Sequence, residues 1–452
     1  MKSERKTLDR LLGVFADVHA GEGLTALLLA LNIFLILMSY YVLKPVREAL
    51  ILGEGSAELK TYMSAGQVVA LAIVVPYYGR LVARFSRIRL INVVTAFFVV
   101  CLLFFYALAQ LGVPLAIVFF LWIGVFNLMI VAQFWSFAND IYSKEQGERL
   151  FAIVGFGASL GAVVGSSAAD SLVEPLGVNQ LMLVGAIVLF AQLIVTNVVD
   201  RWESAREVAP RVATDSTGAG KGGAFGLVFR TRYLLLMALL LMLLNWVNTT
   251  GEYILGSIVK DTASDMIRTG RAGGLTEGQL IADFYSKFFT LVNASGLLLQ
   301  LFVVSRIVKY WGVPWAVMVL PAVSLGAYGV MAFTPVLMAV LGAKVAENSL
   351  NYSLNNTVRN MLFLPCTYEE KFSAKQAIDS FFVRIGDVLS ALLVFVGTVV
   401  VPLRSTEFAA VNTAIVVAWL ILAWRTGHYY RVRTGSLTSG PAAAKIEAPG
   451  VA

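Results

Sequence analysis

Histidine and cysteine are scarce in this chain of 452 residues, and charged residues are few. The two histidines, His19 and His428, lie near the termini, so we expect no histidine-based catalytic site or proton relay. The two cysteines, Cys101 and Cys366, are far apart and suggest neither a disulfide framework nor a metal motif. Charged residues make up 14% of the chain and hydrophobic residues 58%. Since soluble domains average about 25% charged residues, the composition predicts a polytopic membrane protein.

Signatures of enzymes and motors are also missing. The chain has no HExxH and no GxSxG motif. Gly220 and Lys221 hint at a phosphate loop, but the pattern GxxxxGK[ST] fails because Asp215 and Gly222 occupy two of its positions. We therefore expect no enzyme, no ATP-hydrolysing motor, no cofactor and no metal. A lipid-modifying enzyme and a non-catalytic sensor remain as minor alternatives.

Twelve segments are apolar enough to cross a bilayer, which takes about 20 residues. They lie approximately at 24–48, 61–78, 90–109, 114–138, 150–169, 178–199, 233–256, 281–304, 313–333, 336–358, 376–400 and 408–424. The predicted fold class is an all-α membrane protein with twelve transmembrane helices in two six-helix bundles.

Lysine and arginine are distributed unevenly between the two sets of loops. Of the 35 such residues, 25 fall on one side and 5 on the other, and the remaining 5 lie inside spans. Because cytoplasmic loops carry the excess of positive charge, both termini are predicted to be cytoplasmic. The net charge of +7 is then mostly a signal of topology, and no nucleic-acid partner is needed to explain it.

The domain organisation follows from the spans. Residues 1–23 alternate charge and apolar residues at helical spacing, which predicts an amphipathic segment at the cytoplasmic membrane surface. Residues 24–199 and 233–424 form the two bundles. Residues 200–232 are rich in charge, Gly, Ser and Thr and are read as a cytoplasmic linker. Residues 425–452 are predicted to be a disordered cytoplasmic tail.

Both signs of charge occur inside the spans, where each charge costs at least ~3 kcal/mol. Such a chain is expected to enclose a wet, polar cavity, as a transporter of a charged solute needs. Arg384 and Asp387, one helical turn apart in the eleventh span, are expected to pair directly, and Lys375 and Asp379 lie just before them. The pair either locks the structure or contacts the ligand and gates its passage.

The tenth span carries a polar stripe. Lys344, Asn348, Asn351, Asn355 and Arg359 are spaced by 4, 3, 4 and 4 residues, and Glu347 lies close to them. This spacing places the five residues on one face of a helix, which cannot face lipid. The stripe either lines a cavity or joins helices through hydrogen bonds.

Charges also mark the first and seventh spans. Lys44 and Arg47 share a helix face next to Glu48, and Pro45 between them is expected to kink the helix beside a binding site. The alternative for these residues is snorkelling at the outer rim. Glu252 lies one turn beyond a group of polar residues in an otherwise apolar span, which favours a functional role.

Two patterns are read as structural. Gly157, Gly161 and Gly165 form a ladder of small residues that predicts close packing against a neighbouring helix. Asp283 and Lys287, four residues apart, are expected to pair at the outer surface.

Several segments resemble known transporters. The basic loops at Arg80 and Arg306 resemble, in degenerate form, the short loop of the major facilitator superfamily. Tyr41–Leu52, Phe134–Gly165 and Ser353–Ala391 are similar to segments of the ATP/ADP nucleotide transporters of plastids and obligate intracellular bacteria, a branch of that superfamily. The resemblance implies twelve spans, nucleotide exchange by alternating access, basic residues that grip phosphates, and a bacterial inner-membrane location.

The resemblance also assigns individual positions. Arg47 and Glu48 match the family's basic residue and acid in the first span, and Glu252 matches the acid of the seventh. Arg359 matches the basic residue after the tenth span, and Lys375 with Asp379 matches a K…ID signature. No acid lies between Trp122 and Trp135, where nucleotide-carrying members are expected to have one; Asn127 and Gln133 are the carboxamides there.

These observations predict a secondary transporter of a small anionic solute, most simply a nucleotide exchanger. Its anion-binding residues are predicted to be Lys44, Arg47, Lys344 and Arg359, together with Asn348, Asn351 and Asn355. The predicted gating or charge-pairing residues are Glu48, Glu252, Glu347, Lys375, Asp379, Arg384 and Asp387. The alternative is a proton-coupled or facilitative transporter of another anion or amphipathic metabolite, in which Glu48, Glu252 or Asp379 carries the proton. The sequence leaves the oligomeric state open.

Overall fold

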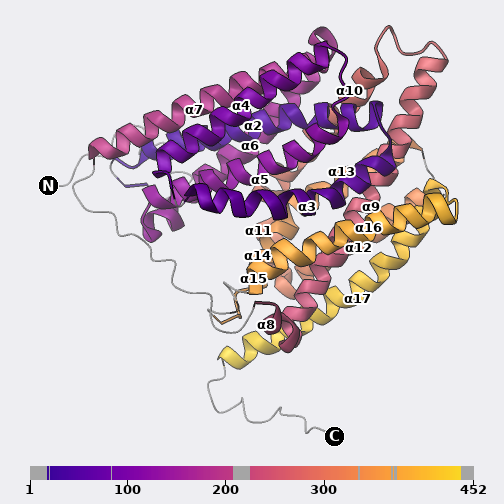
Figure 1. Cartoon of the computed structure of the whole chain (residues 1–452). Helices are drawn as coiled ribbons and strands as arrows, with labels where there is room; N and C mark the ends of the chain where they lie inside the picture. The colour runs from indigo at the N-terminus through magenta and orange to yellow at the C-terminus, as the bar shows by residue number, and fades with distance from the viewer. Residues whose placement is uncertain are drawn as a thin grey trace, which may run out of the picture. The chain divides into compact units, whose positions relative to one another are not determined.

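The computed structural model of the chain describes residues 18–19, 21–82, 84–206, 224–333, 336–367, 370 and 374–438 (Figure 1). Within these ranges every regular element is a helix and none is a strand. A helix satisfies its backbone hydrogen bonds internally, which a segment in lipid must do. The predicted all-α membrane fold is confirmed.

The first half of the chain contains long apolar helices. They are α2 (Gly23–Gly53), α3 (Ala57–Val82), α4 (Arg87–Gln110), α5 (Ala116–Ile141), α6 (Lys144–Leu176) and α7 (Gln180–Arg206), followed by the short α8 (Ala224–Arg230). The first six overlap the first six predicted spans. Most of them extend several residues beyond the apolar run, because polar residues continue the helix outside it.

The second half is more interrupted. Its elements are α9 (Arg232–Arg268), α10 (Glu277–Phe302), α11 (Val304–Trp311), α12 (Val313–Phe333), α13 (Leu337–Leu350), η1 (Asn351–Asn355), α14 (Asn356–Met361), α15 (Lys375–Ala377), η3 (Ile378–Phe382), α16 (Val383–Phe395), η4 (Val396–Val400) and α17 (Ser405–Thr438). The three η elements are π-helical, a form that is rare and frequent at functional sites.

Ten of the described helices are long and apolar enough to cross a membrane. An eleventh span is obtained when α10 and α11, which are bent by 46° at their junction, are counted as one. The predicted span over 336–358 is an unbroken succession of α13, η1 and α14, but the π-helical turn divides it into pieces that are short on their own. All twelve predicted segments are therefore helical.

The ends of the chain differ from expectation at one place. Helix α17 continues to Thr438, so the predicted disordered tail from 425 is helical in its first part. A contact that holds this extension is the pair between Arg433 and Glu370, whose nitrogen and oxygen are 3.1 Å apart. Residues 1–17 of the predicted amphipathic segment at 1–23, residues 207–223 of the predicted linker and residues 439–452 lie outside the described residues.

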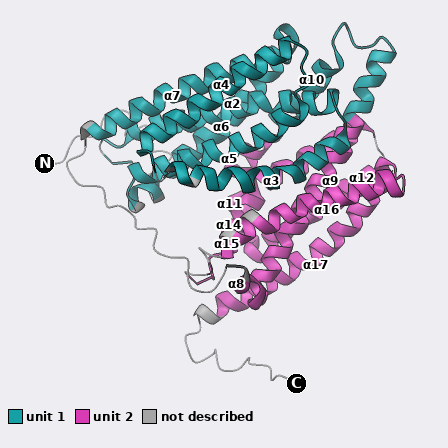
Figure 2. Cartoon of the chain, in the orientation of Figure 1, with its two compact units in different colours: residues 1–214, 259–294 teal, residues 215–258, 295–452 magenta. Residues whose placement is uncertain are grey.

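The chain divides into two compact units (Figure 2). Unit 1 comprises residues 1–214 and 259–294, and unit 2 comprises residues 215–258 and 295–452. Each unit thus contains part of α9 and part of α10. The predicted division into bundles at 24–199 and 233–424 stays a prediction.

In unit 1, helix α2 packs against α5, α6 and α7. The predicted glycine ladder lies at the contact between α6 and α2. A Cβ atom on Gly161 would lie 2.3 Å from the carbonyl oxygen of Phe34, and one on Gly157 or Gly165 would lie 2.5 Å from a carbonyl oxygen of α2. Only glycine allows this approach, so the structural interpretation of the ladder is confirmed.

Just before α2, Glu22 is held by several donors. It accepts hydrogen bonds from Arg149 at 3.0 Å, Gln146 at 3.1 Å and the backbone of His19 at 3.0 Å. Burial by itself raises the pKa of the Glu22 carboxyl. The hydrogen-bond donors and the Arg149 charge together outweigh this effect and lower the pKa to about 2. The ion pair therefore joins the beginning of α2 to α6 at neutral pH.

Candidate functional site

A buried ionic cluster lies in unit 1 around Glu48 of α2, whose side chain is fully buried. Its carboxylate is contacted by Lys60 of α3, with Nζ 2.8 Å from Oε2. The neighbouring Arg47 donates through Nε at 3.1 Å and through Nη2 to Oε1. A buried carboxylate is stable only when it is paired in this way. We call Glu48, Arg47, Lys60 and the adjacent Lys44 the Glu48 cluster.

Aromatic rings surround the cations of the Glu48 cluster. The Lys44 ammonium lies 3.9 Å from the centre of the Phe289 ring and 5.2 Å from that of Tyr41. The Lys60 ammonium lies 5.1 Å from the Tyr285 ring, so α10 supplies two of these faces. Cation–π contacts of this kind stabilise a partly desolvated charge by about 0.5–2 kcal/mol each. Lys44 is buried, which contradicts snorkelling at the rim.

A second buried cluster lies in unit 2 around Lys344 and Glu347 of α13. Both are almost completely buried, and the Lys344 Nζ is 2.7 Å from a Glu347 oxygen. Helix α9 adds Glu252, with an oxygen 3.5 Å from the same Nζ, and Asn248, with its Oδ1 at 3.4 Å. One ammonium thus lies between two carboxylates.

Helix α12 completes this arrangement through Tyr328. Its hydroxyl oxygen lies 2.9 and 3.1 Å from the two carboxylate oxygens of Glu347. On the other side, the Asn348 amide donates to Glu252 at 3.2 Å. Every charged group of the set therefore has a polar partner. We call Lys344, Glu347, Glu252 and Tyr328 the Glu347 cluster.

The predicted pair of Arg384 and Asp387 forms in α16, with the arginine nitrogen 3.1 Å from a carboxylate oxygen. The other oxygen of Asp387 accepts hydrogen bonds from Asn245 and Thr249 of α9, both at 2.8 Å. The backbones approach closely here, because a Cβ on Gly386 would lie 2.6 Å from the Met242 carbonyl oxygen. The acid therefore joins α16 to α9.

The C-terminal members of the polar stripe pair with residues outside the Glu347 cluster. Arg359 donates to Asp379 through two nitrogens at 2.5 and 3.2 Å, and both side chains are partly exposed. Asn355 donates to Asn351 at 2.8 Å within the π-helical turn η1. Lys375 donates to Asn360 at 2.9 Å on an exposed surface. The stripe predicted as one α-helical face is thus interrupted by η1, and its members join separate groups.

Two residues of these clusters, Lys60 and Tyr328, are not predicted from the sequence patterns. Lys60 falls in a predicted loop before the span at 61–78, but α3 begins at Ala57 and buries it. Tyr328 is a single aromatic in an apolar run. The signal that was available for Lys60 is its position only twelve residues after Glu48, across one short turn from the same helix end.

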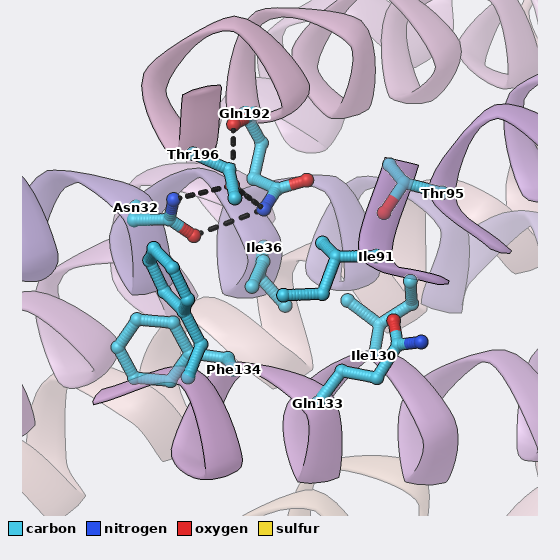
Figure 3. Close-up of a pocket in the computed structure, with 10 residues that line it drawn as sticks. Asn32, Ile36, Ile91, Thr95, Ile130, Gln133, Phe134, Gln192 and Thr196 are labelled. Carbon is cyan, nitrogen blue, oxygen red and sulfur yellow. Dashed lines mark hydrogen bonds between the residues drawn. The ribbon is translucent and has the colours of Figure 1, made fainter. Parts of the chain in front are cut away.

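A small polar cavity in unit 1 is a different kind of feature (Figure 3). Asn32, Gln192 and Thr196 bond one another at 2.7–2.9 Å, and the buried Gln133 lines the same cavity. The cavity holds about 10 Å³, which suffices for one water molecule at most. It therefore joins helices and is too small for a solute such as a nucleobase.

Metal binding finds no support in the part of the chain that the structure describes. Within it, no three His, Cys, Asp or Glu side chains are grouped to hold an ion. The described clusters consist instead of cations, carboxylates and carboxamides, which are suited to binding and releasing an anion.

Comparison with known families agrees with this fold. Residues 29–364 match the model of the Major Facilitator Superfamily. Residues 315–430 match the model described as TLC ATP/ADP transporter. The second match covers most of the α12–α17 region, which contains Lys344, Glu347 and Tyr328 of the Glu347 cluster but not Glu252 of α9. The predicted resemblance is confirmed by both.

Relatives and solved structures extend the similarity to nearly the whole chain. ADP,ATP carrier protein 1 of Chlamydia pneumoniae is 24% identical over 93% of this chain and 94% of its own length. ADP,ATP carrier protein 2 of Chlamydia trachomatis is 21% identical over 97% and 94%. The crystal structure of the nucleoside transporter NupG aligns with a TM-score of 0.63 at 14% identity, covering 91% of this chain and 99% of that one. At this identity the structural likeness concerns the fold.

Proposed function

The chain belongs to the Major Facilitator Superfamily, and on this premise we propose that it exchanges nucleotides of the ATP/ADP type across the bacterial inner membrane by alternating access. Both termini would be cytoplasmic, as the distribution of positive charge in the loops favours. The substrate class is supported by the ADP,ATP carriers that align over more than nine-tenths of the chain.

The observation that carries the proposal is the presence of a buried cation–carboxylate cluster in each unit. In the Glu48 cluster, Arg47 and Lys60 hold one carboxylate, and in the Glu347 cluster Lys344 is held by two. A phosphate group presents the same oxygen acceptors as a carboxylate with more charge. The phosphates of a nucleotide would therefore replace the internal carboxylates as partners of Arg47, Lys60 and Lys344, with Lys44 as an adjacent cation.

This replacement favours exchange over one-way transport. Separating Lys344 from Glu347 without a substitute would leave a buried charge unpaired, which costs about 3–5 kcal/mol. The empty carrier would therefore reorient slowly, and a carrier whose cations are paired with phosphate would reorient quickly. An exchanger needs this difference.

The remaining site residues would act beside the Glu347 cluster, within unit 2. Asn348, Asn351 and Asn355 offer carboxamides that can bond a ribose or a base. Arg359 with Asp379, and Arg384 with Asp387, would open and close as the carrier changes state, since the first pair is partly exposed and can exchange its partner for phosphate. Lys375 lies outside this group on the surface that bears Asn360.

The direct test is uptake into proteoliposomes that contain the purified full-length protein and are preloaded with ATP, ADP, inorganic phosphate or buffer. We expect labelled ADP to enter at least tenfold faster with nucleotide inside than with buffer. Equal rates under all four conditions would contradict nucleotide exchange. Arg47→Gln should abolish uptake, whereas Lys287→Gln, which removes an exposed cation paired with Asp283, should leave it unchanged.

A second candidate is proton-coupled transport of another anion. It is favoured by Asp387, a buried acid whose one oxygen accepts only from the neutral groups Asn245 and Thr249. A protonated Asp387 would keep part of this network, so it could carry a proton. Uptake that is driven by an imposed pH gradient without internal nucleotide, and that is lost in Asp387→Asn, would favour this candidate.

A further inference from the structure

An apolar cleft with a basic rim lies on unit 2, at the junction of α11 and α12. We propose that it binds an anionic phospholipid of the cytoplasmic leaflet, with an acyl chain in the cleft and the phosphate at Lys309 and Arg431. This inference does not depend on the identity of the transported solute.

The cleft has the size and lining of a lipid site. Its volume is about 610 Å³, within the range of about 300–1,000 Å³ that small-molecule sites occupy. It is lined by Tyr310, Trp311, Trp315, Met318, Val319 and Ala322. Tyr310 is 74% exposed and Trp315 is 54% exposed. Tyrosine and tryptophan are typical of the interface between headgroups and acyl chains, because each has an apolar ring and a polar atom.

The fold brings cations to the rim of this cleft. Helix α12 packs against α17, and the Arg431 guanidinium carbon lies 6.0 Å from the centre of the Trp315 ring. On the α11 side, the Lys309 ammonium lies 5.7 Å from the Tyr310 ring. Each cation is thus attached to an aromatic residue of the lining and remains exposed to the surroundings.

Acidic residues are missing from the segments that form this site. No Asp or Glu occurs in 303–346 or in 408–438, whereas Arg306, Lys309, Arg425 and Arg431 do, besides Lys344 and Arg433, which pair with Glu347 and Glu370. Within the described ranges, neither Lys309 nor Arg431 has a carboxylate oxygen within 4 Å. The positive charge of the rim is therefore not neutralised by the described residues of the protein.

The combination selects one occupant. A free phosphate ion would use the two cations but leave the exposed aromatic cleft uncovered, and a neutral lipid would cover the cleft but leave the cations without a counter-charge. An anionic phospholipid satisfies both features. All four cations lie on the side that carries the excess of lysine and arginine, which is the side where anionic headgroups attract basic residues.

The test measures thermal unfolding of the purified full-length protein in detergent, with phosphatidylglycerol or phosphatidylcholine added in equal amounts. We expect phosphatidylglycerol to raise the midpoint by at least 3 °C more than phosphatidylcholine does, on the order of the shift that a specific ligand produces. In the double variant Lys309→Gln/Arg431→Gln this difference should disappear, and in the control Arg404→Gln it should remain. Equal shifts from both lipids in the wild type, or a full difference in the double variant, would overturn the proposal.

Two further arms separate the alternatives. Sodium phosphate at millimolar concentration should not reproduce the shift, and reproduction of the whole shift by phosphate alone would show that no lipid is needed. If the double variant does not fold, fluorescence of the wild type in bilayers decides the matter. Brominated phosphatidylglycerol should quench tryptophan more than brominated phosphatidylcholine, and the excess should vanish in Trp311→Phe/Trp315→Phe, which removes both tryptophans of the lining. An equal effect of the two lipids would contradict the site.

Discussion

The Glu48 cluster of unit 1 and the Glu347 cluster of unit 2 combine the same charges in opposite proportions. In the first, one carboxylate is contacted by two cations, Arg47 and Lys60. In the second, one ammonium, that of Lys344, lies near two carboxylates. In each cluster the shared residue, Glu48 or Lys344, carries the charge sign that occurs only once among these three residues and is fully buried. Removing that shared charge should therefore have opposite electrostatic consequences in the two units.

The largest effect is expected for the shared cation of unit 2. Lys344→Met leaves Glu347 and Glu252 without their cation, which should lower the free energy of unfolding by about 3–5 kcal/mol and abolish exchange. Thermal unfolding and proteoliposome uptake measure the two effects.

A matched double variant sharpens this prediction. In Lys344→Met/Glu347→Gln, one buried charge of each sign is gone, so most of the stability should return while exchange stays absent. A double variant that is as unstable as the single one would show that the ion pair is not the source of the loss.

Close backbone packing is common to both units, and its disruption should rank second. Gly161→Ala places a Cβ against the α2 backbone in unit 1, and Gly386→Ala does the same against α9 in unit 2. Each should lower the free energy of unfolding by about 1–3 kcal/mol through overpacking. Gly155→Ala in α6 is the control, because a Cβ there meets no atom within 4 Å, and denaturation of this variant should occur at the wild-type temperature or above.

Removal of the shared anion of unit 1, Glu48, should have a smaller effect than removal of Lys344. It should strengthen nucleotide binding instead of abolishing exchange through loss of a cation. Glu48→Gln removes the internal competitor for Arg47 and Lys60, so a nucleotide should bind about tenfold more tightly, equivalent to about 1.4 kcal/mol. Turnover should fall because release becomes slower. Isothermal titration with ADP measures the affinity, and weaker binding in Glu48→Gln than in the partly exposed control Glu277→Gln would refute the competition.

The smallest effect concerns the pair of Glu22 and Arg149 in unit 1. Because the pKa of Glu22 is lowered to about 2 from 4.5, its contribution to stability is complete above pH 4.5 and is lost as the pH falls toward 2. The contribution should be about 1 kcal/mol or less. The difference in unfolding temperature between wild type and Glu22→Gln should therefore be constant from pH 7 to pH 5 and shrink below it. If the difference in unfolding temperature grew as the pH falls, it would contradict the predicted loss of the ion pair.

Much of the fold is readable from the sequence, because a bilayer imposes a simple rule on length and polarity. All twelve predicted segments are helical, and Arg384–Asp387 and Asp283–Lys287 pair as their spacing predicts. The position of the glycine ladder was equally clear, since small residues at every fourth position leave few alternatives. These are local patterns within one helix.

The clusters were less predictable, because they depend on partners from different helices. Nothing in an apolar run marks Tyr328 as the partner of Glu347, and Lys60 lies at a helix start that hydropathy alone places too late. The π-helical turn η1 changes the angle between Asn351 and Asn355 and ends the single face that α-helical spacing predicts for the stripe. A π-helical turn forms when a backbone amide bonds a carbonyl five residues earlier instead of four. The residue types in the segment do not determine this choice.

The central claim is that buried cations hold the phosphates of the solute, and calorimetric titration of the purified wild-type protein with ATP, ADP, AMP and adenosine tests it most directly. We expect the affinity to fall at each removal of a phosphate and adenosine to bind at least 100-fold more weakly than ATP, which corresponds to about 2.7 kcal/mol. Adenosine that binds as tightly as ATP would contradict the account.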